Sequence, residues 1–205
     1  MKPLKVLPQN YEFSTSLDLI KDQKTLVKVN ILAIIGFFVF GWLFLGALTW
    51  LRPETVASGF SYTFSGLTTV ISRLLSFLVV VAIMVVLHEF IHGILFWMFT
   101  REIPKVAFKG FYAYAAAPGW FIPRNQYLLV GIGPFLIITL VGIGLIVIVP
   151  QVILFPLLIL LTLNASGSAG DLLAVGWLLR HPATSYIEDQ GVKTSVYVPQ
   201  KQESL

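Results

Sequence analysis

The sequence predicts an all-α integral membrane protein with four transmembrane helices and a short re-entrant β-hairpin on the cytoplasmic side of the membrane. Three observations lead to this prediction. Hydrophobic residues make up 57% of the 205 residues and charged residues only 12%, whereas a soluble domain carries roughly 25% charged residues. Four stretches remain apolar over the roughly 20 residues that a helix needs to cross a bilayer. One connecting loop is more aromatic than an aqueous loop would be.

The predicted membrane domain covers residues 30–179, between a cytoplasmic N-terminal segment of residues 1–29 and a cytoplasmic tail of residues 180–205. We expect its transmembrane helices at Asn30–Leu51, Leu74–Phe99, Tyr127–Val149 and Gln151–Leu179. Charged residues are spread over the first 29 positions, where a cleaved secretory signal would carry its apolar core, so the first span should remain as an anchor. No internal repeat is visible, which disfavours a transporter.

The distribution of Lys and Arg predicts a multi-pass protein of the cell membrane with both termini in the cytoplasm. In this orientation only Arg52 and Arg73 lie outside, and the other twelve of the 14 basic residues lie inside. Cytoplasmic loops carry such an excess. Because the basic residues flank the spans, the net charge of +4 indicates topology and a lipid partner, and we expect no nucleic-acid partner. Cysteine is absent, which excludes thiolate sites.

The loop of residues 100–126 is predicted to form the re-entrant hairpin. Its core, KVAFKGFYAYAAAPGWFIP, covers residues 105–123. Strand alternation gives one face to four side chains, Val106, Phe108, Tyr112 and Tyr114, and Pro118-Gly119 is a turn signal. The alternative is an amphipathic segment held at the membrane interface by Trp and Tyr. The polar tail from His181 also has two interpretations, a hairpin that turns at Gln190-Gly191 or an extended segment.

The second span contains the motif HEFIH in the middle of the apolar stretch VVLHEFIHGILF. The acidic and histidine residues inside the predicted spans are His88, Glu89, His92 and Asp171. A charged side chain at mid-membrane costs about 2.5–3.5 kcal/mol, so these residues are candidates for function. His88 and His92 lie one turn apart on one helix face. Two such imidazoles can bind one Zn²⁺, and the carboxylate of Glu89 can reach the water of the metal.

Asp171 is the predicted third protein ligand, since a catalytic zinc site usually has three protein ligands and one water. His92 lies eight residues before Thr100 and Asp171 nine residues before Arg180. These distances correspond to roughly 12 and 13 Å of helix, so both residues lie at a similar depth below the cytoplasmic face. Asp171 closes the stretch NASGSAGD, whose small and polar residues interrupt the fourth span. Its first residue, Asn164, could hold a substrate carbonyl or the oxyanion, or it could cap the broken helix.

The order of these motifs resembles the site-2 protease class of intramembrane metalloproteases. The resemblance is carried by HEFIHG, by the strand-like loop, by RNQYLLVGIGPFLI with its Gly-Pro pair, and by NASGSAGD. The chain is more closely similar to a family of small bacterial membrane proteins described as putative zincin peptidases, whose Leu-Pro and Tyr signature corresponds to LPQNY from Leu7. The resemblance covers nearly the whole chain. It implies a zinc site formed by His88, His92 and Asp171, and a membrane-associated hairpin after the HExxH helix.

The sequence therefore favours a zinc-dependent intramembrane endopeptidase that hydrolyses peptide bonds of membrane-associated protein or peptide substrates. Glu89 would accept a proton from the attacking water and pass it to the leaving amine. The hairpin edge, with Tyr112 and Tyr114, would hold an unwound peptide in an extended conformation by strand addition. One alternative is a non-catalytic metal-binding membrane scaffold that binds a partner protein. Another is a proton or metal transporter built from the same residues.

Overall fold

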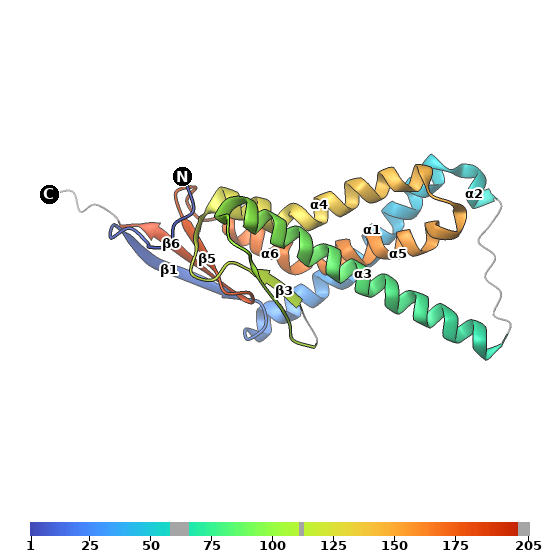
Figure 1. Cartoon of the computed structure of the whole chain (residues 1–205), viewed down its shortest axis with the longest axis horizontal. Coiled ribbons are helices and arrows are strands. Elements are labelled where there is room, and N and C mark those ends of the chain that lie inside the picture. The colour runs from blue at the N-terminus through green and yellow to red at the C-terminus, as the bar shows by residue number, and fades with distance from the viewer. Residues whose placement is uncertain (58–65, 111–112, 201–205) are drawn as a thin grey trace. The chain divides into compact units, whose positions relative to one another are not determined.

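The computed structural model describes residues 1–57, 66–110 and 113–200. Among these residues, four helical segments are long and apolar enough to cross a membrane, as the sequence predicted (Figure 1). They are formed by α1 (Gln23–Leu51), α3 (Leu67–Thr100), α4 (Arg124–Ile148) and the consecutive helices α5 (Gln151–Gly167) and α6 (Ala169–Leu178), while the short α2 (Pro53–Ala57) follows α1. These features suggest a membrane protein.

The helices extend beyond the apolar stretches from which they were predicted. α1 begins at Gln23, directly after Asp22, whose carboxylate accepts hydrogen bonds from the Lys24 amide and the Thr25 hydroxyl. Such a residue satisfies backbone donors that the first helical turn leaves without partners. α3 begins at Leu67 instead of Leu74. Hydropathy marks only the apolar part of a helix, whereas backbone hydrogen bonding continues into its polar flanks.

A four-stranded antiparallel sheet was not predicted, so the all-α expectation holds only for the spans. The sheet has the strand order β1 (Tyr11–Asp18), β6 (Lys193–Pro199), β5 (Tyr186–Asp189) and β4 (Phe121–Pro123). In Figure 1 β1 and β6, which come from opposite ends of the chain, lie side by side. The hairpin interpretation of the tail is confirmed, because β5 and β6 pair around a turn at Gly191, which has a φ of +98°.

The predicted hairpin after α3 is present in a shorter form. β2 (Lys105–Phe108) pairs with β3 (Ala113–Ala116) in a separate two-stranded sheet, whereas β4 joins the larger sheet. Tyr112 lies outside the described residues. The predicted common face is wrong for Tyr114, because the register places Tyr114 opposite Ala107 and therefore on the face away from Val106 and Phe108. The turn between the strands breaks the alternation that a single strand would continue.

The chain divides into two compact units. The first comprises Met1–Asn30, Glu89–Pro134 and Gly170–Leu205, and the second comprises Ile31–His88 and Phe135–Ala169. The first unit holds both sheets, and its core consists of side chains from α3, α4, α6 and the larger sheet, among them Phe96, Ile122, Tyr127, Leu178, Ile187 and Val196. In the second unit, Gly142 of α4 faces Leu161 of α5 so closely that a Cβ would lie 2.2 Å from the leucine side chain.

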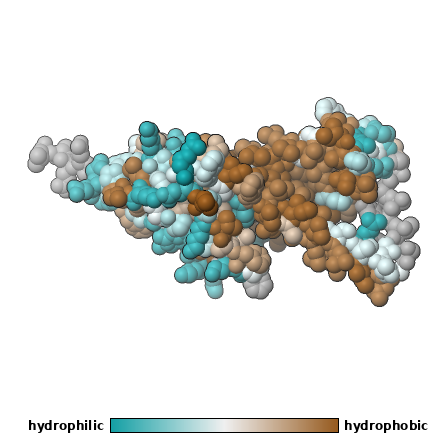
Figure 2. Space-filling view, viewed as in Figure 1, coloured by the Kyte–Doolittle hydropathy of each residue, from teal (hydrophilic) through white to brown (hydrophobic). Residues whose placement is uncertain are grey.

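The surface of the long helices is strongly hydrophobic. Figure 2 shows hydrophobic residues over the helical region and hydrophilic residues over the strands. Large side chains such as Phe38, Trp42 and Leu140 are exposed on α1 and α4. Soluble monomers rarely expose continuous apolar patches larger than a few hundred Å², so this surface also suggests a membrane protein.

Candidate metal centre

His92 lies on α3, and its ring orientation is set by the backbone of α4. Its Nδ1 lies 3.0 Å from the carbonyl oxygen of Val130. A carbonyl oxygen only accepts hydrogen bonds, so Nδ1 carries the proton and Nε2 is the nitrogen that can bind a metal. This Nε2 lies 3.6 Å from Oδ2 of Asp171. Two atoms that bind one Zn²⁺ in a tetrahedron lie roughly 3.4 Å apart, so the two side chains are spaced for a shared ion.

Asp171 follows the point at which the fourth span is divided, as NASGSAGD predicted. α5 ends at Gly167, and both the amide and the hydroxyl of Ser168 donate to the carbonyl oxygen of Asn164. α6 then begins at Ala169 and places Asp171 in its first turn. A carboxylate in the first turn of a helix interacts favourably with the helix dipole.

His88 is oriented by a different acceptor. Its Nδ1 lies 3.0 Å from Oδ1 of Asn164, and both side chains are buried in the second unit. His88 can therefore also offer Nε2 to a metal. The predicted substrate role of Asn164 stays a prediction, whereas its contact with His88 was not predicted. Hydrogen bonds of this kind at Nδ1 are the usual way in which proteins orient metal-binding histidines.

One ligand atom from each of His88, His92 and Asp171 lies within 4.8 Å of the other two. The boundary between the two units runs between His88 and Glu89, but α3 is continuous there and carries His88 one turn before His92. The group could therefore hold a metal ion, and two imidazoles with one carboxylate are a donor set that suits zinc.

A cavity of about 240 Å³ in the first unit is lined by Glu89, His92 and Asp171. Glu89 therefore lines the same space as two candidate ligands. Much of the remaining wall is apolar and comes from α1, α6 and the β5–β6 turn. Such a cavity has room for several waters, each of which occupies roughly 30 Å³.

Tyr127 and Asp189 line this cavity too, and the sequence analysis did not identify them. The Tyr127 hydroxyl donates to Oδ2 of Asp189 over 2.6 Å, and the Gly191 amide donates to Oδ1 over 2.6 Å. Burial raises the pKa of Asp189 to about 6, although these two hydrogen bonds lower it. The signal that could have found Asp189 is the alternation of the tail hairpin, which places Asp189 and Glu188 on opposite faces of β5.

Tyr114 of β3 lines the cavity as well, together with Ala113 and Ala115. Its ring packs against the β5–β6 turn, where a Cβ at Gly191 would lie 2.6 Å from the ring. The structure therefore places Tyr114 beside the candidate metal centre. Its predicted role in substrate binding stays a prediction.

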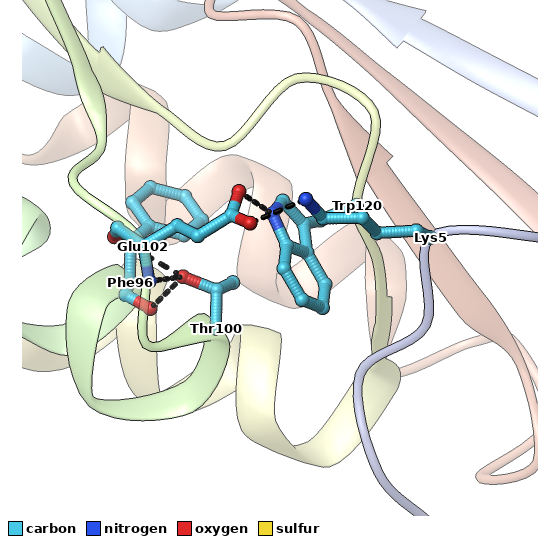
Figure 3. A network of polar contacts seen from close by, with 5 residues as sticks. All are labelled: Lys5, Phe96, Thr100, Glu102 and Trp120. Carbon is cyan, nitrogen blue, oxygen red and sulfur yellow. Dashed lines mark hydrogen bonds and ion pairs between the residues drawn. The ribbon is translucent and has the colours of Figure 1, made fainter.

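The hairpin is anchored to α3 by the polar network that Figure 3 shows. The Thr100 hydroxyl donates to the Phe96 carbonyl oxygen and accepts from the Glu102 amide. The Glu102 carboxylate accepts from Nε1 of Trp120 over 3.0 Å and pairs with the ammonium of Lys5. Hydrogen bonds from Lys5 and then Trp120 hold the pKa of Glu102 below its usual range. The network joins the N-terminal segment to both ends of the loop that carries β2 and β3.

Comparisons with known proteins bear on the same residues. The model of a family described as putative zincin peptidase matches residues 81–186, slightly more than half of the chain. This range contains His88, Glu89, His92 and Asp171. No curated protein and no solved structure matches the chain.

Proposed function

Because the chain belongs to the putative zincin peptidase family, we propose that it is a zinc-dependent, membrane-embedded endopeptidase. The observation that carries the proposal is the grouping of His88, His92 and Asp171, of which His92 and Asp171 line a cavity that Glu89 also lines. Catalytic zinc sites combine three protein ligands with an open position for water. A purely structural metal site would not need a carboxylate beside its ligands.

In this proposal Glu89 is the general base and acid. A Zn²⁺ held by His88, His92 and Asp171 would lower the pKa of a bound water and would polarise the carbonyl group of a substrate. Glu89 accepts a proton from the attacking water, whose oxygen forms the new bond to the carbonyl carbon. The proton then passes to the amide nitrogen as the carbon–nitrogen bond breaks.

The proposed substrates are membrane-associated proteins or peptides. A helix hides its backbone in internal hydrogen bonds, so it has to unwind before it is cut. β3 lines the cavity with Ala113, Tyr114 and Ala115, and within the described residues it pairs with β2 alone. The second edge of β3 suits an extended peptide that adds as a further strand.

The proposed location is the cell membrane. Four spans with both termini in the cytoplasm would place residues 1–29, 180–205 and the hairpin loop on the cytoplasmic side, in line with the distribution of Lys and Arg. The cavity would then receive water and substrate from that side.

The test compares membrane peptides released in native host cells that carry the wild-type protein or Glu89→Gln. We expect the released peptides to depend on Glu89, with a decrease of at least roughly 100-fold, because general acid–base catalysis contributes that much or more. Zinc content of the purified proteins should be equal. The matched control is Glu54→Gln, which changes an exposed carboxylate of α2.

Three outcomes would contradict the proposal. Cleavage that persists in zinc-loaded Glu89→Gln would remove the proposed base. A zinc-bound wild-type protein whose released peptides do not differ from those of Glu89→Gln would indicate the non-catalytic scaffold. Metal flux into liposomes that contain the purified protein would indicate a transporter.

A further inference from the structure

The carbonyl group of Val130, which orients His92, lies inside a helix, where carbonyl groups are normally occupied. In an α-helix the carbonyl of residue i accepts from the N–H of residue i+4. For Val130 that residue is Pro134, which lies inside α4 and is fully buried. Proline has no N–H. The donor that the helix would ordinarily supply to Val130 is therefore missing from the covalent structure.

The same stretch of α4 allows close approach of its neighbours. A Cβ at Gly133 would lie 2.2 Å from Cδ1 of Leu95 on α3, and one at Gly131 would lie 2.9 Å from Cγ2 of Val175 on α6. Leu95 is three residues after His92 on α3. The glycines thus let α3 pass close to the backbone of α4, at the level where the His92 ring reaches a carbonyl of that helix.

We propose that Pro134 is a positioning residue of the metal centre. By removing the N–H at position 134, it reserves the Val130 carbonyl for the Nδ1–H of His92 and so directs Nε2 towards Asp171. This inference rests on the proposed zinc site, but its first consequence concerns the metal-free protein. A proline inside a helix is destabilising, and the orientation of His92 offsets that loss.

The competing explanation is that Pro134 only shapes α4. The two explanations predict different effects of Pro134→Ala, which restores an N–H at position 134. If Pro134 only shapes the helix, His92 keeps its hydrogen bond. If Pro134 positions His92, the new N–H competes for the Val130 carbonyl and the ring loses its fixed tautomer.

The experiment records the ring nitrogen signals of His92 by NMR in the full-length, metal-free protein in nanodiscs. The chain has three histidines, so the signals can be assigned by substitution. We expect the Nδ1–H tautomer in the wild type and a tautomer mixture in Pro134→Ala. Zinc affinity, measured by competition with a chelator, should fall by roughly 10-fold, the lower end of the effect of losing a ligand-orienting partner.

Two further variants complete the design. Pro156→Ala changes the proline inside α5, in the second unit. The carbonyl four residues before this proline belongs to the exposed Val152, so the substitution should leave both measurements unchanged. An α-hydroxy acid analogue of alanine at position 134 forms an ester that lacks the N–H. It should restore the wild-type tautomer and zinc affinity without the proline ring.

An unchanged tautomer and unchanged zinc affinity in Pro134→Ala would overturn the inference. A Pro134→Ala protein that fails to fold, or that unfolds at a lower temperature than the wild type, would also overturn it, because the role of Pro134 would then lie in the fold. These results are independent of cleavage. A wild-type protein that binds zinc but releases no peptides would contradict the proposed function and leave the role of Pro134 intact.

Discussion

The two histidines of the candidate centre take their orientations from acceptors of different kinds. His88 donates to the side chain of Asn164, whereas His92 donates to the backbone of Val130. A side-chain acceptor is visible in the sequence as a polar residue in an apolar span, and Asn164 was identified for that reason. A backbone acceptor leaves no residue type to recognise in the sequence. The Val130 carbonyl, which accepts from His92, could be predicted only through Pro134, the proline four residues after Val130.

Asp189 provides a prediction about pH. Its pKa of about 6 in the folded protein lies above the value of about 3.9 for an unfolded chain, so folding favours the protonated form. The resulting stabilisation is complete below about pH 4 and is lost as the pH rises through about 6. In the metal-free protein, we expect the free energy of unfolding relative to Asp189→Asn to fall by roughly 2 kcal/mol from pH 4 to pH 7.

Denaturant titrations of both proteins in detergent at several pH values would measure this difference. The groups that face Asp189 are Tyr127 of α4, His92 of α3 and Asp171 of α6, so the titration should change when the metal binds. Glu188→Gln, at the neighbouring position of β5, is the matched control and should keep the pH dependence of the wild type. A pH dependence equal to that of Asp189→Asn would contradict the burial of an ionisable carboxyl.

The residues of the candidate site differ in how visible they are in the sequence. His88, Glu89 and His92 stand out because ionisable side chains are expensive in an apolar span, and Asp171 because its depth matches that of His92. The structure brings the three predicted ligands together. Tyr127 and Asp189 are ordinary residues of a helix start and a polar tail. They meet because β5, which ends at Asp189, pairs with β4, which directly precedes α4.

Among the elements, α4 depends on its small residues. A methyl group at Gly133 would lie 2.2 Å from Cδ1 of Leu95, whereas one at Gly144 of the same helix meets nothing within 4 Å. We expect Gly133→Ala to lower the thermal unfolding temperature and to weaken zinc binding, because the Leu95 side chain of α3 has to shift away from α4. The overpacking should destabilise by roughly 1–3 kcal/mol.

Gly144→Ala is the matched control for this prediction. It adds the same methyl group in open space and should be neutral or stabilising by up to about 1 kcal/mol, the helix propensity difference between the two residues. Equal unfolding temperatures for the two variants would show that Leu95 moves aside without resistance. Parallel thermal scans and chelator competition of both purified variants would decide the question.

The strands were harder to predict than the helices for a physical reason. An apolar stretch of sufficient length predicts a span from local sequence alone, but β1 pairs with β6, from the other end of the chain. Neither strand is complete without its partner. The hairpin after α3 was predicted from its aromatic content. The face predicted for Tyr114 was wrong, because Gly110, with a φ of +75°, lies in the turn between the two strands.

On the scale of the whole molecule, the proposed orientation can be tested because the chain has no cysteine. Single cysteines at the exposed positions Ser14, Glu54 and Ala183 would each report one segment. In intact cells, a membrane-impermeant maleimide should label Glu54→Cys and should label Ser14→Cys and Ala183→Cys only after permeabilisation. The expectation follows from the excess of basic residues in the inner segments.

Labelling of Ser14→Cys in intact cells would contradict the predicted topology. Labelling of Ser14→Cys and Ala183→Cys from opposite sides would contradict the sheet itself, since β1 and the β5–β6 hairpin pair with one another. Solubilised protein, in which all three positions are accessible, serves as the control for reactivity.

The pairing of β1 with β6 also has a consequence for the order of events during synthesis. The ribosome makes β1 before any of the spans, and this strand cannot pair until β6 has been made, after all four spans. Asp171 likewise leaves the ribosome long after the HExxH helix. A chain that has been translated as far as the HExxH helix therefore carries His88, Glu89 and His92. It has neither the complete four-stranded sheet nor the third proposed ligand, Asp171. If the proposed function is correct, the timing of translation would thus keep the chain inactive until Asp171 has been made.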